Sequence, residues 1–155
     1  MYCVIFDLDG TLCDTTHREH ILRDRSLFLT TKERWNLFYS ELINDSPIVP
    51  NVNLVKILKE TYYVIYLTAR PEKYRDLTNK WVSKYIGDEF YSSLIMREDE
   101  YLGAVEYKEK AYEELRKEGY EPILILDDDL DIVKMFKEKG LPAFYCGDIS
   151  FRMGI

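Results

Sequence analysis

Two aspartates near the N-terminus of the chain are separated by a single residue. Asp7 and Asp9 lie in the segment VIFDLDGTL, residues 4–12, where they follow a short apolar run and precede a glycine that permits a sharp turn. A carboxylate can attack phosphorus, and the acyl phosphate that forms divides one difficult displacement into two. A second carboxyl group nearby can give a proton to the leaving oxygen and later take one from the attacking water. Two acids placed in this way could therefore serve phosphoryl transfer in two different roles.

A second set of acids follows another apolar run, in the segment ILDDDLD, residues 125–131. An anionic substrate beside carboxylates needs compensating positive charge, because two like charges ~5 Å apart repel by ~3 kcal/mol at an effective dielectric constant of about 20. Hard oxygen ligands suit Mg²⁺. We expect four carboxylates to serve as its ligands: Asp7, Asp9, Asp127 and Asp128. The later acids of this segment can instead cap the helix that follows.

Two further segments supply hydroxyl and cationic groups. In VIYLTARP, residues 64–71, an apolar strand ends at Thr68, whose hydroxyl can donate to a phosphoryl oxygen, and a helix beginning at Pro71 would add its positive end. Arg70 can either bind the substrate or lie on the surface as a charge at a helix start. Lys108 and Lys110 are both placed to neutralise the nucleophile, but on a helix they face different ways.

The elements that must position these residues follow from the apolar pattern. Five short apolar runs predict strands buried in a parallel sheet, at residues 2–6, 62–67, 93–96, 123–126 and 143–146. Helical spacing alternates with them at residues 51–60, 74–85, 105–117 and 130–139. The alternation indicates an α/β fold, a doubly wound, Rossmann-like parallel sheet with helices on both faces. Ligands of such sheets bind beyond the carboxyl ends of the strands.

Residues 14–50 interrupt the alternation. Thr30 and Glu33 have the spacing of a capping box before an amphipathic helix. Basic and aromatic residues of this insert could contact phosphates or stack on bases: Arg18, Arg23, Phe28, Arg34 and Trp35. The helical spacing of Trp35 and its apolar neighbours favours a core position for that side chain instead.

Composition limits the class of protein. The 155 residues are 46% hydrophobic and 32% charged, which is typical of a single domain, here residues 1–155. No apolar run approaches the ~20 residues of a membrane span and no basic secretory start is present, so we expect a cytoplasmic protein with no membrane partner. Three scattered cysteines argue against a disulfide framework or a zinc site. The net charge of −7 opposes nonspecific binding to nucleic acid, although residues 17–34 and 70–84 are locally basic.

The motif DLDGT at the end of the first strand resembles the first motif of haloacid dehalogenase superfamily phosphatases. The strand ending in Thr68, the helical lysine and the acidic segment resemble the other three motifs. This resemblance implies that Asp7 is the nucleophile, that Asp9 is the acid and base, and that Mg²⁺ is the cofactor. It also places residues 14–50 where the superfamily carries its cap, which is here small and helical.

Over nearly its whole length the chain resembles the 3′-phosphatase domain of phage polynucleotide kinase-phosphatases. The similar points include a small residue and arginine after the second strand, Lys80-Trp81-Val82, Met96-Arg97, Lys108-Glu109 and the acidic segment. The resemblance implies that Thr68, Ala69 and Arg70 bind the substrate, and it favours Lys108 over Lys110. The implied substrate is the 3′-phosphate of a nucleic-acid end or nucleotide. The chain contains no Gly-x-x-x-x-Gly-Lys-Ser/Thr phosphate loop, so a kinase partner would be a separate protein.

Two other functions stay open at this point. A 5′-nucleotidase or small-metabolite phosphatase of the same superfamily would carry a similar small cap. A phospho-accepting, receiver-like switch shares the doubly wound sheet and the aspartyl phosphate, but a second acid two residues after the nucleophile suits turnover better. The sequence leaves the oligomeric state open.

Overall fold

The computed structural model describes residues 1–87, 92–98 and 100–147. Its centre is a five-stranded sheet in the order β5-β4-β1-β6-β7, and each neighbouring pair is parallel. The strands are β1 (Tyr2–Phe6), β4 (Tyr63–Pro71), β5 (Ser92–Arg97), β6 (Glu121–Asp127) and β7 (Ala143–Tyr145). This order confirms the doubly wound sheet, with all five predicted strands in it.

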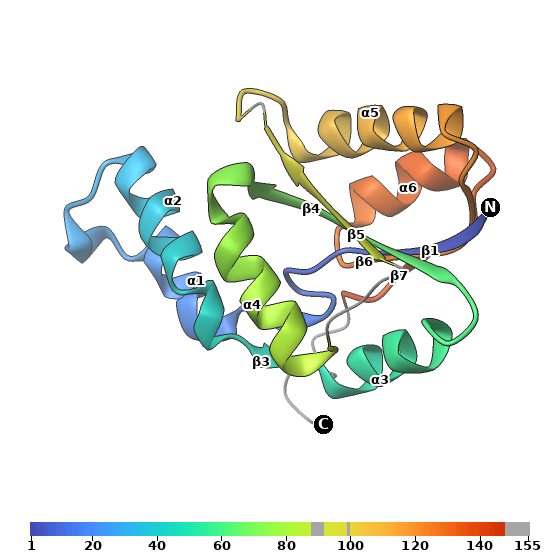
Figure 1. Ribbon diagram of the computed structural model, residues 1–155. Helices are drawn as coiled ribbons and strands as arrows, with labels where there is room; N and C mark the ends of the chain where they lie inside the picture. Colours follow the sequence, from blue (N-terminus) through green and yellow to red (C-terminus); the bar gives the residue numbers. More distant parts are fainter. Residues whose placement is uncertain (88–91, 99, 148–155) are drawn as a thin grey trace.

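Helices cover both faces of the sheet, as Figure 1 shows. They are α3 (Val49–Leu58) and α4 (Arg75–Tyr85) on one face, and α5 (Ala104–Lys117) and α6 (Leu130–Glu138) on the other. Side chains alternate along β1, so that Val4 and Phe6 pack toward α3 and α4, whereas Cys3 and Ile5 pack toward α5 and α6. The apolar run of β1 is continuous because both of its faces are buried.

Strand β4 is longer than predicted. It continues through Arg70 to Pro71, and a 3₁₀ turn, η3 (Glu72–Tyr74), separates it from α4. The prediction of a helix beginning at Pro71 was therefore wrong. The register between β4 and β5 shifts after Leu67, so that Pro71 pairs with Arg97 and the strand carries Arg70 past the end of β1.

The insert between β1 and α3 is mainly helical. It consists of β2 (Cys13–Asp14), α1 (Thr16–Arg23), η1 (Arg25–Leu27), α2 (Thr31–Ser40), η2 (Leu42–Asn44) and β3 (Ser46–Pro47). Thr30 and Glu33 form the predicted capping box of α2. Strands β2 and β3 pair antiparallel at the base of the insert, and α1 and α2 lie beyond the carboxyl ends of the sheet strands (Figure 1).

Two features tie the insert to the domain. Trp81 of α4 is buried and donates from its indole N–H to the Asp45 carbonyl at 2.8 Å. Asn51 of α3 donates to the Thr11 carbonyl at 2.8 Å. Among the described residues, no helix is long and apolar enough to cross a membrane.

Candidate active site

The carboxyl ends of three neighbouring strands bring the predicted residues together. Asp7 directly follows β1, Thr68 lies toward the end of β4, and Asp127 ends β6. Because β1 lies between β4 and β6, Asp7 is the middle of the three. Its backbone N–H donates to the Leu126 carbonyl at 3.0 Å, and all three side chains are buried. The sheet therefore fixes the spacing of these groups.

Lys108 joins the acids of β1 and β6. Its Nζ donates to Asp7 Oδ1 at 2.8 Å and to Asp127 Oδ2 at 2.6 Å, and the side chain is 2% exposed. Burial disfavours a charged lysine, but the charges of Asp7 and Asp127 outweigh it and raise the pKa of Lys108. Lys110, by contrast, is exposed and lies 3.8 Å from Glu106. Lys108 is thus the lysine that faces the site.

One lysine leaves the acidic group with an excess of negative charge. Oxygens of Asp7, Asp127 and Asp128 lie within 4.8 Å of one another. Burial and the charge of Asp7 raise the pKa of Asp127 to about 6 in spite of Lys108. Three hard oxygen donors around an incompletely neutralised centre fit a divalent cation such as Mg²⁺. Thr11 Oγ1 also donates to Asp7 Oδ2 at 3.3 Å, which helps to orient the carboxylate.

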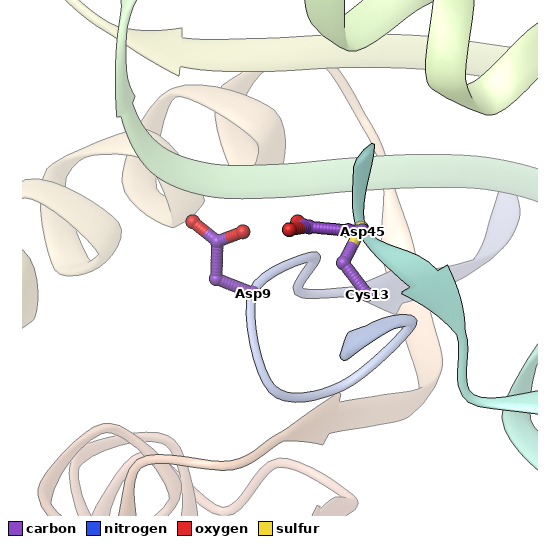
Figure 2. Close-up of side chains that lie close together, drawn as sticks. All are labelled: Asp9, Cys13 and Asp45. Carbon is purple, nitrogen blue, oxygen red and sulfur yellow. The ribbon is translucent and has the colours of Figure 1, made fainter. Parts of the chain in front are cut away.

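Asp9 belongs to a different group of side chains. Figure 2 shows its carboxylate turned toward that of Asp45, with Cys13 beside Asp45. Two arginines fill this site: Arg70 Nη2 lies 2.5 Å and Arg18 Nη2 lies 2.7 Å from Asp9 Oδ1. Burial opposes the charged form, but the two guanidinium groups together lower the pKa of Asp9 to about 2. The structure therefore brings the Asp9 side chain to the arginines and not to the other predicted metal ligands.

Arg70 is a buried side chain and not a surface charge. Its Nε donates to both Asp9 oxygens at 3.1 and 3.2 Å, and its Nη1 donates to Thr78 Oγ1 at 3.1 Å. Its backbone N–H donates to Thr68 Oγ1 at 3.2 Å. Ala69, between these two residues, is half-buried. The strand segment predicted to bind substrate is therefore rigidly held on both sides of Ala69.

Arg18 and Asp45 are the members of this group that sequence reasoning missed. Arg18 was considered as an exposed phosphate contact, but it is completely buried, and its guanidinium lies 4.1 Å from the centre of the Phe38 ring. It donates to both Asp45 oxygens at 2.8 Å and to the Phe38 carbonyl at 3.1 Å. The only signal in the sequence was its position three residues before Ile21, on the buried face of α1.

Trp35 also differs from expectation. The side chain was expected in the core but is 44% exposed. Of the other insert residues proposed for nucleic-acid contact, Arg23 and Arg34 line a pocket together with Trp35, whereas Phe28 is exposed outside it. Arg34 also donates to the carbonyls of Ile21 and Asp24.

Comparison with known protein families identifies the family of this chain. Residues 1–151 match the family model of the polynucleotide kinase PNKP phosphatase domain. The chain belongs to this family. It is therefore a phosphatase domain of the haloacid dehalogenase type, and the superfamily and closer resemblances drawn from its motifs are confirmed.

Solved structures support the assignment of this PNKP-type phosphatase domain. A chain of the Pnkp1/Rnl/Hen1 complex is 29% identical with a TM-score of 0.71, over 93% of this chain and 44% of that chain. This chain thus spans less than half the length of that relative. A haloacid dehalogenase-like hydrolase, SP0104 of Streptococcus pneumoniae, is 15% identical with a TM-score of 0.64, over 92% of this chain and 83% of that chain.

A third similar structure is a hydrolase of the same superfamily solved with magnesium. YfnB of Bacillus subtilis is 15% identical with a TM-score of 0.64, over 94% of this chain and 88% of that chain. At such identities the likeness of YfnB and SP0104 shows the fold alone. No curated protein matches the sequence significantly.

Proposed function

We propose that the protein is a Mg²⁺-dependent phosphomonoesterase that removes 3′-phosphates from nucleic-acid ends, through an aspartyl phosphate on Asp7. The observation that carries the proposal is the position of Asp7 at the centre of the three strand ends, held by Lys108 and Thr11 beside Asp127. The family match supports the nucleic-acid substrate.

The first half-reaction forms the intermediate. A carboxylate oxygen of Asp7 attacks phosphorus, the bond from phosphorus to the sugar oxygen breaks, and the leaving alkoxide takes a proton. Thr68 donates its hydroxyl to a phosphoryl oxygen, and Lys108 balances the charge of the nucleophile. Asp7, Asp127 and Asp128 would hold Mg²⁺, which when bound would supply further charge neutralisation for the transferring group.

Asp9 gives a proton to the leaving oxygen and later takes one from water, but only after its side chain has left the arginines that bind it. In the second half-reaction water attacks phosphorus, the bond from phosphorus to Asp7 breaks, and the carboxylate that earlier gave a proton now accepts one. While Arg18 and Arg70 bind Asp9, its low pKa makes it a poor proton carrier. We infer that Asp9 transfers protons once its side chain leaves these arginines, which Asp45 and Thr78 hold in place.

The setting of the reaction follows from the same proposal. Residues 14–50 act as a small cap over a single domain, which leaves access for a polymer end. A relative occurs in the Pnkp1/Rnl/Hen1 complex, which supports partner proteins for this chain as well, a kinase among them. The cysteines of the described residues are free, which fits a reducing, cytoplasmic environment.

Phosphate release from matched 3′- and 5′-phosphorylated oligonucleotides tests the proposal. We expect Mg²⁺-dependent release from the 3′ end, abolished in Asp7→Asn and in EDTA. Release from 5′-mononucleotides or sugar phosphates alone would keep the phosphatase and replace the substrate with that of a 5′-nucleotidase or metabolite phosphatase. A switch that keeps its acyl phosphate is set aside, because the family to which the chain belongs consists of phosphatase domains.

A further inference from the structure

A pocket opens between the insert and the carboxyl ends of β4 and β5. Its volume is about 730 Å³, and it is lined by α2 on one side and by Ala69, Pro71 and Ala104 on the other. Ala69 lies between Thr68 and Arg70, and Ala104 begins the helix that carries Lys108. The pocket therefore adjoins the site proposed for the terminal phosphate.

An aromatic stack forms one wall of this pocket, which we call the α2 pocket. Trp35 stacks on Tyr39 with ring centroids 5.7 Å apart and planes 26° apart, and Tyr39 packs on Tyr74 at 5.3 Å. Trp35 ends the stack, lines the pocket and keeps 44% of its surface exposed. A planar ring placed against it would extend the stack, and every nucleobase offers such a ring.

The pocket is also basic within an acidic protein. Lys32, Lys73 and Arg97 line it together with one acid, Glu100, whereas the whole chain carries a net charge of −7. Burial, together with the charge of Asp9, raises the pKa of Tyr39 to about 12, so that this phenol keeps its proton and adds no negative charge to the pocket. A polyanion is the ligand that this distribution attracts.

Arg97 supplies a donor that lacks a partner. Its Nη1 donates to the Leu102 carbonyl at 2.9 Å, but its Nε–H is buried and, within the described part of the chain, has no hydrogen-bond acceptor. An unsatisfied buried donor is costly, and a phosphate oxygen pairs with a guanidinium more strongly than a neutral acceptor does. The pocket thus combines a stacking surface with a guanidinium group whose hydrogen bonds are incompletely satisfied.

We propose, building on the 3′-phosphatase function above, that the α2 pocket binds the nucleotide that precedes the phosphorylated terminal one. The base of this nucleotide stacks on Trp35, and the phosphodiester next to it pairs with Arg97. The substrate is accordingly a single-stranded polynucleotide end, because a paired base cannot reach an aromatic wall and a mononucleotide leaves the pocket empty.

Steady-state kinetics on two substrates tests this assignment. We expect kcat/KM for a 3′-phosphorylated single-stranded oligonucleotide to exceed that for a nucleoside 3′-monophosphate. Trp35→Ala should reduce this preference by about tenfold, mostly through KM, and Trp35→Phe should restore most of it.

Arg97→Gln should also reduce the preference for the oligonucleotide. Phe28→Ala is the control, because Phe28 is an exposed aromatic residue of the same insert outside the pocket, and this variant should keep the native preference. Equal losses on both substrates in Trp35→Ala, or no preference in the native protein, would overturn the assignment.

A binding measurement separates this proposal from the proposed activity. An oligonucleotide without a terminal phosphate should quench the fluorescence of the Asp7→Asn variant, because it stacks on exposed Trp35. The double variant Asp7→Asn/Trp35→Phe keeps only buried Trp81, and its fluorescence should not be quenched. Quenching in Asp7→Asn, with no phosphatase activity of the native protein on any nucleic-acid end, would refute the proposed function and keep the binding pocket. Activity of the native protein on 3′ ends, with no quenching in Asp7→Asn, would keep the function and refute the binding pocket.

Discussion

Arg18 and Asp45, on two different segments of the insert, are joined by two hydrogen bonds of 2.8 Å, and neither side chain is exposed to water. This pairing fixes the guanidinium group that reaches Asp9, 2.7 Å away. It therefore connects the folding of the insert to the position of the carboxylate that we propose as the proton carrier.

Loss of one member of this pair should destabilise the fold. Arg18→Met leaves the Asp45 carboxylate buried with one fewer cation, so we expect the free energy of unfolding to fall by about 3–5 kcal/mol. Urea unfolding followed by circular dichroism measures the change. Arg23→Met, on the exposed side of the same helix, is the matched control and should change it by less than about 0.5 kcal/mol. Equal stabilities of the two variants would show that the buried pair contributes nothing.

Lys108 and Lys110 should differ sharply in activity. Lys108→Ala removes the cation that contacts both Asp7 and Asp127, so we expect kcat to fall by about 10²–10³-fold. Lys110→Ala removes only a surface ion pair with Glu106 and should retain native rates. Phosphate release from an aryl phosphate measures both without depending on the nucleic-acid substrate. A full loss in Lys110→Ala would reverse the assignment.

The sheet and the acids at its strand ends could be predicted from sequence because the physics is local. Continuous apolar runs that end in polar residues indicate buried parallel strands, and the carboxyl ends of such strands meet at one edge. Asp7, Thr68 and Asp127 meet there because the strand order is β4-β1-β6. Pattern alone favoured neither Lys108 nor Lys110, since only the packing of α5 on the sheet decides which lysine faces the acids.

The pairing of Asp9 with two arginines could not be predicted in this way. Asp45 lies in a turn without regular periodicity, 27 residues from Arg18, and the contact depends on how the whole insert folds back. The prediction that Trp35 lies in the core came from helical spacing. Such spacing shows which residues share a face of α2, but it does not show what covers that face. On this side of α2 there is a pocket in place of a second helix.

Mg²⁺ should stabilise the protein through the acids of β1 and β6. A ligand at ten times its Kd stabilises the native state by about 1.4 kcal/mol, which corresponds to a rise in Tm of roughly 4 °C for a domain of this size. Thermal unfolding with and without Mg²⁺ measures the shift independently of catalysis. Asp127→Asn should abolish it, whereas Asp131→Asn, an exposed acid outside the cluster, should retain it. An unchanged shift in Asp127→Asn would place the metal elsewhere.

Asp9 should contribute a distinct acid dependence to stability. Its pKa is lowered from 3.8 to about 2 in the folded protein, so the unfolded chain binds the proton more readily. The stabilisation by Asp9 is complete above pH ~4 and is lost as the pH falls toward 2, a change of about 2 kcal/mol. Urea unfolding at a series of pH values in this window should show a steeper dependence for the native protein than for Asp9→Asn, by close to one proton. Parallel slopes would mean that the arginines do not hold Asp9 in its ionised form, and that the change of partners proposed for proton transfer is unnecessary.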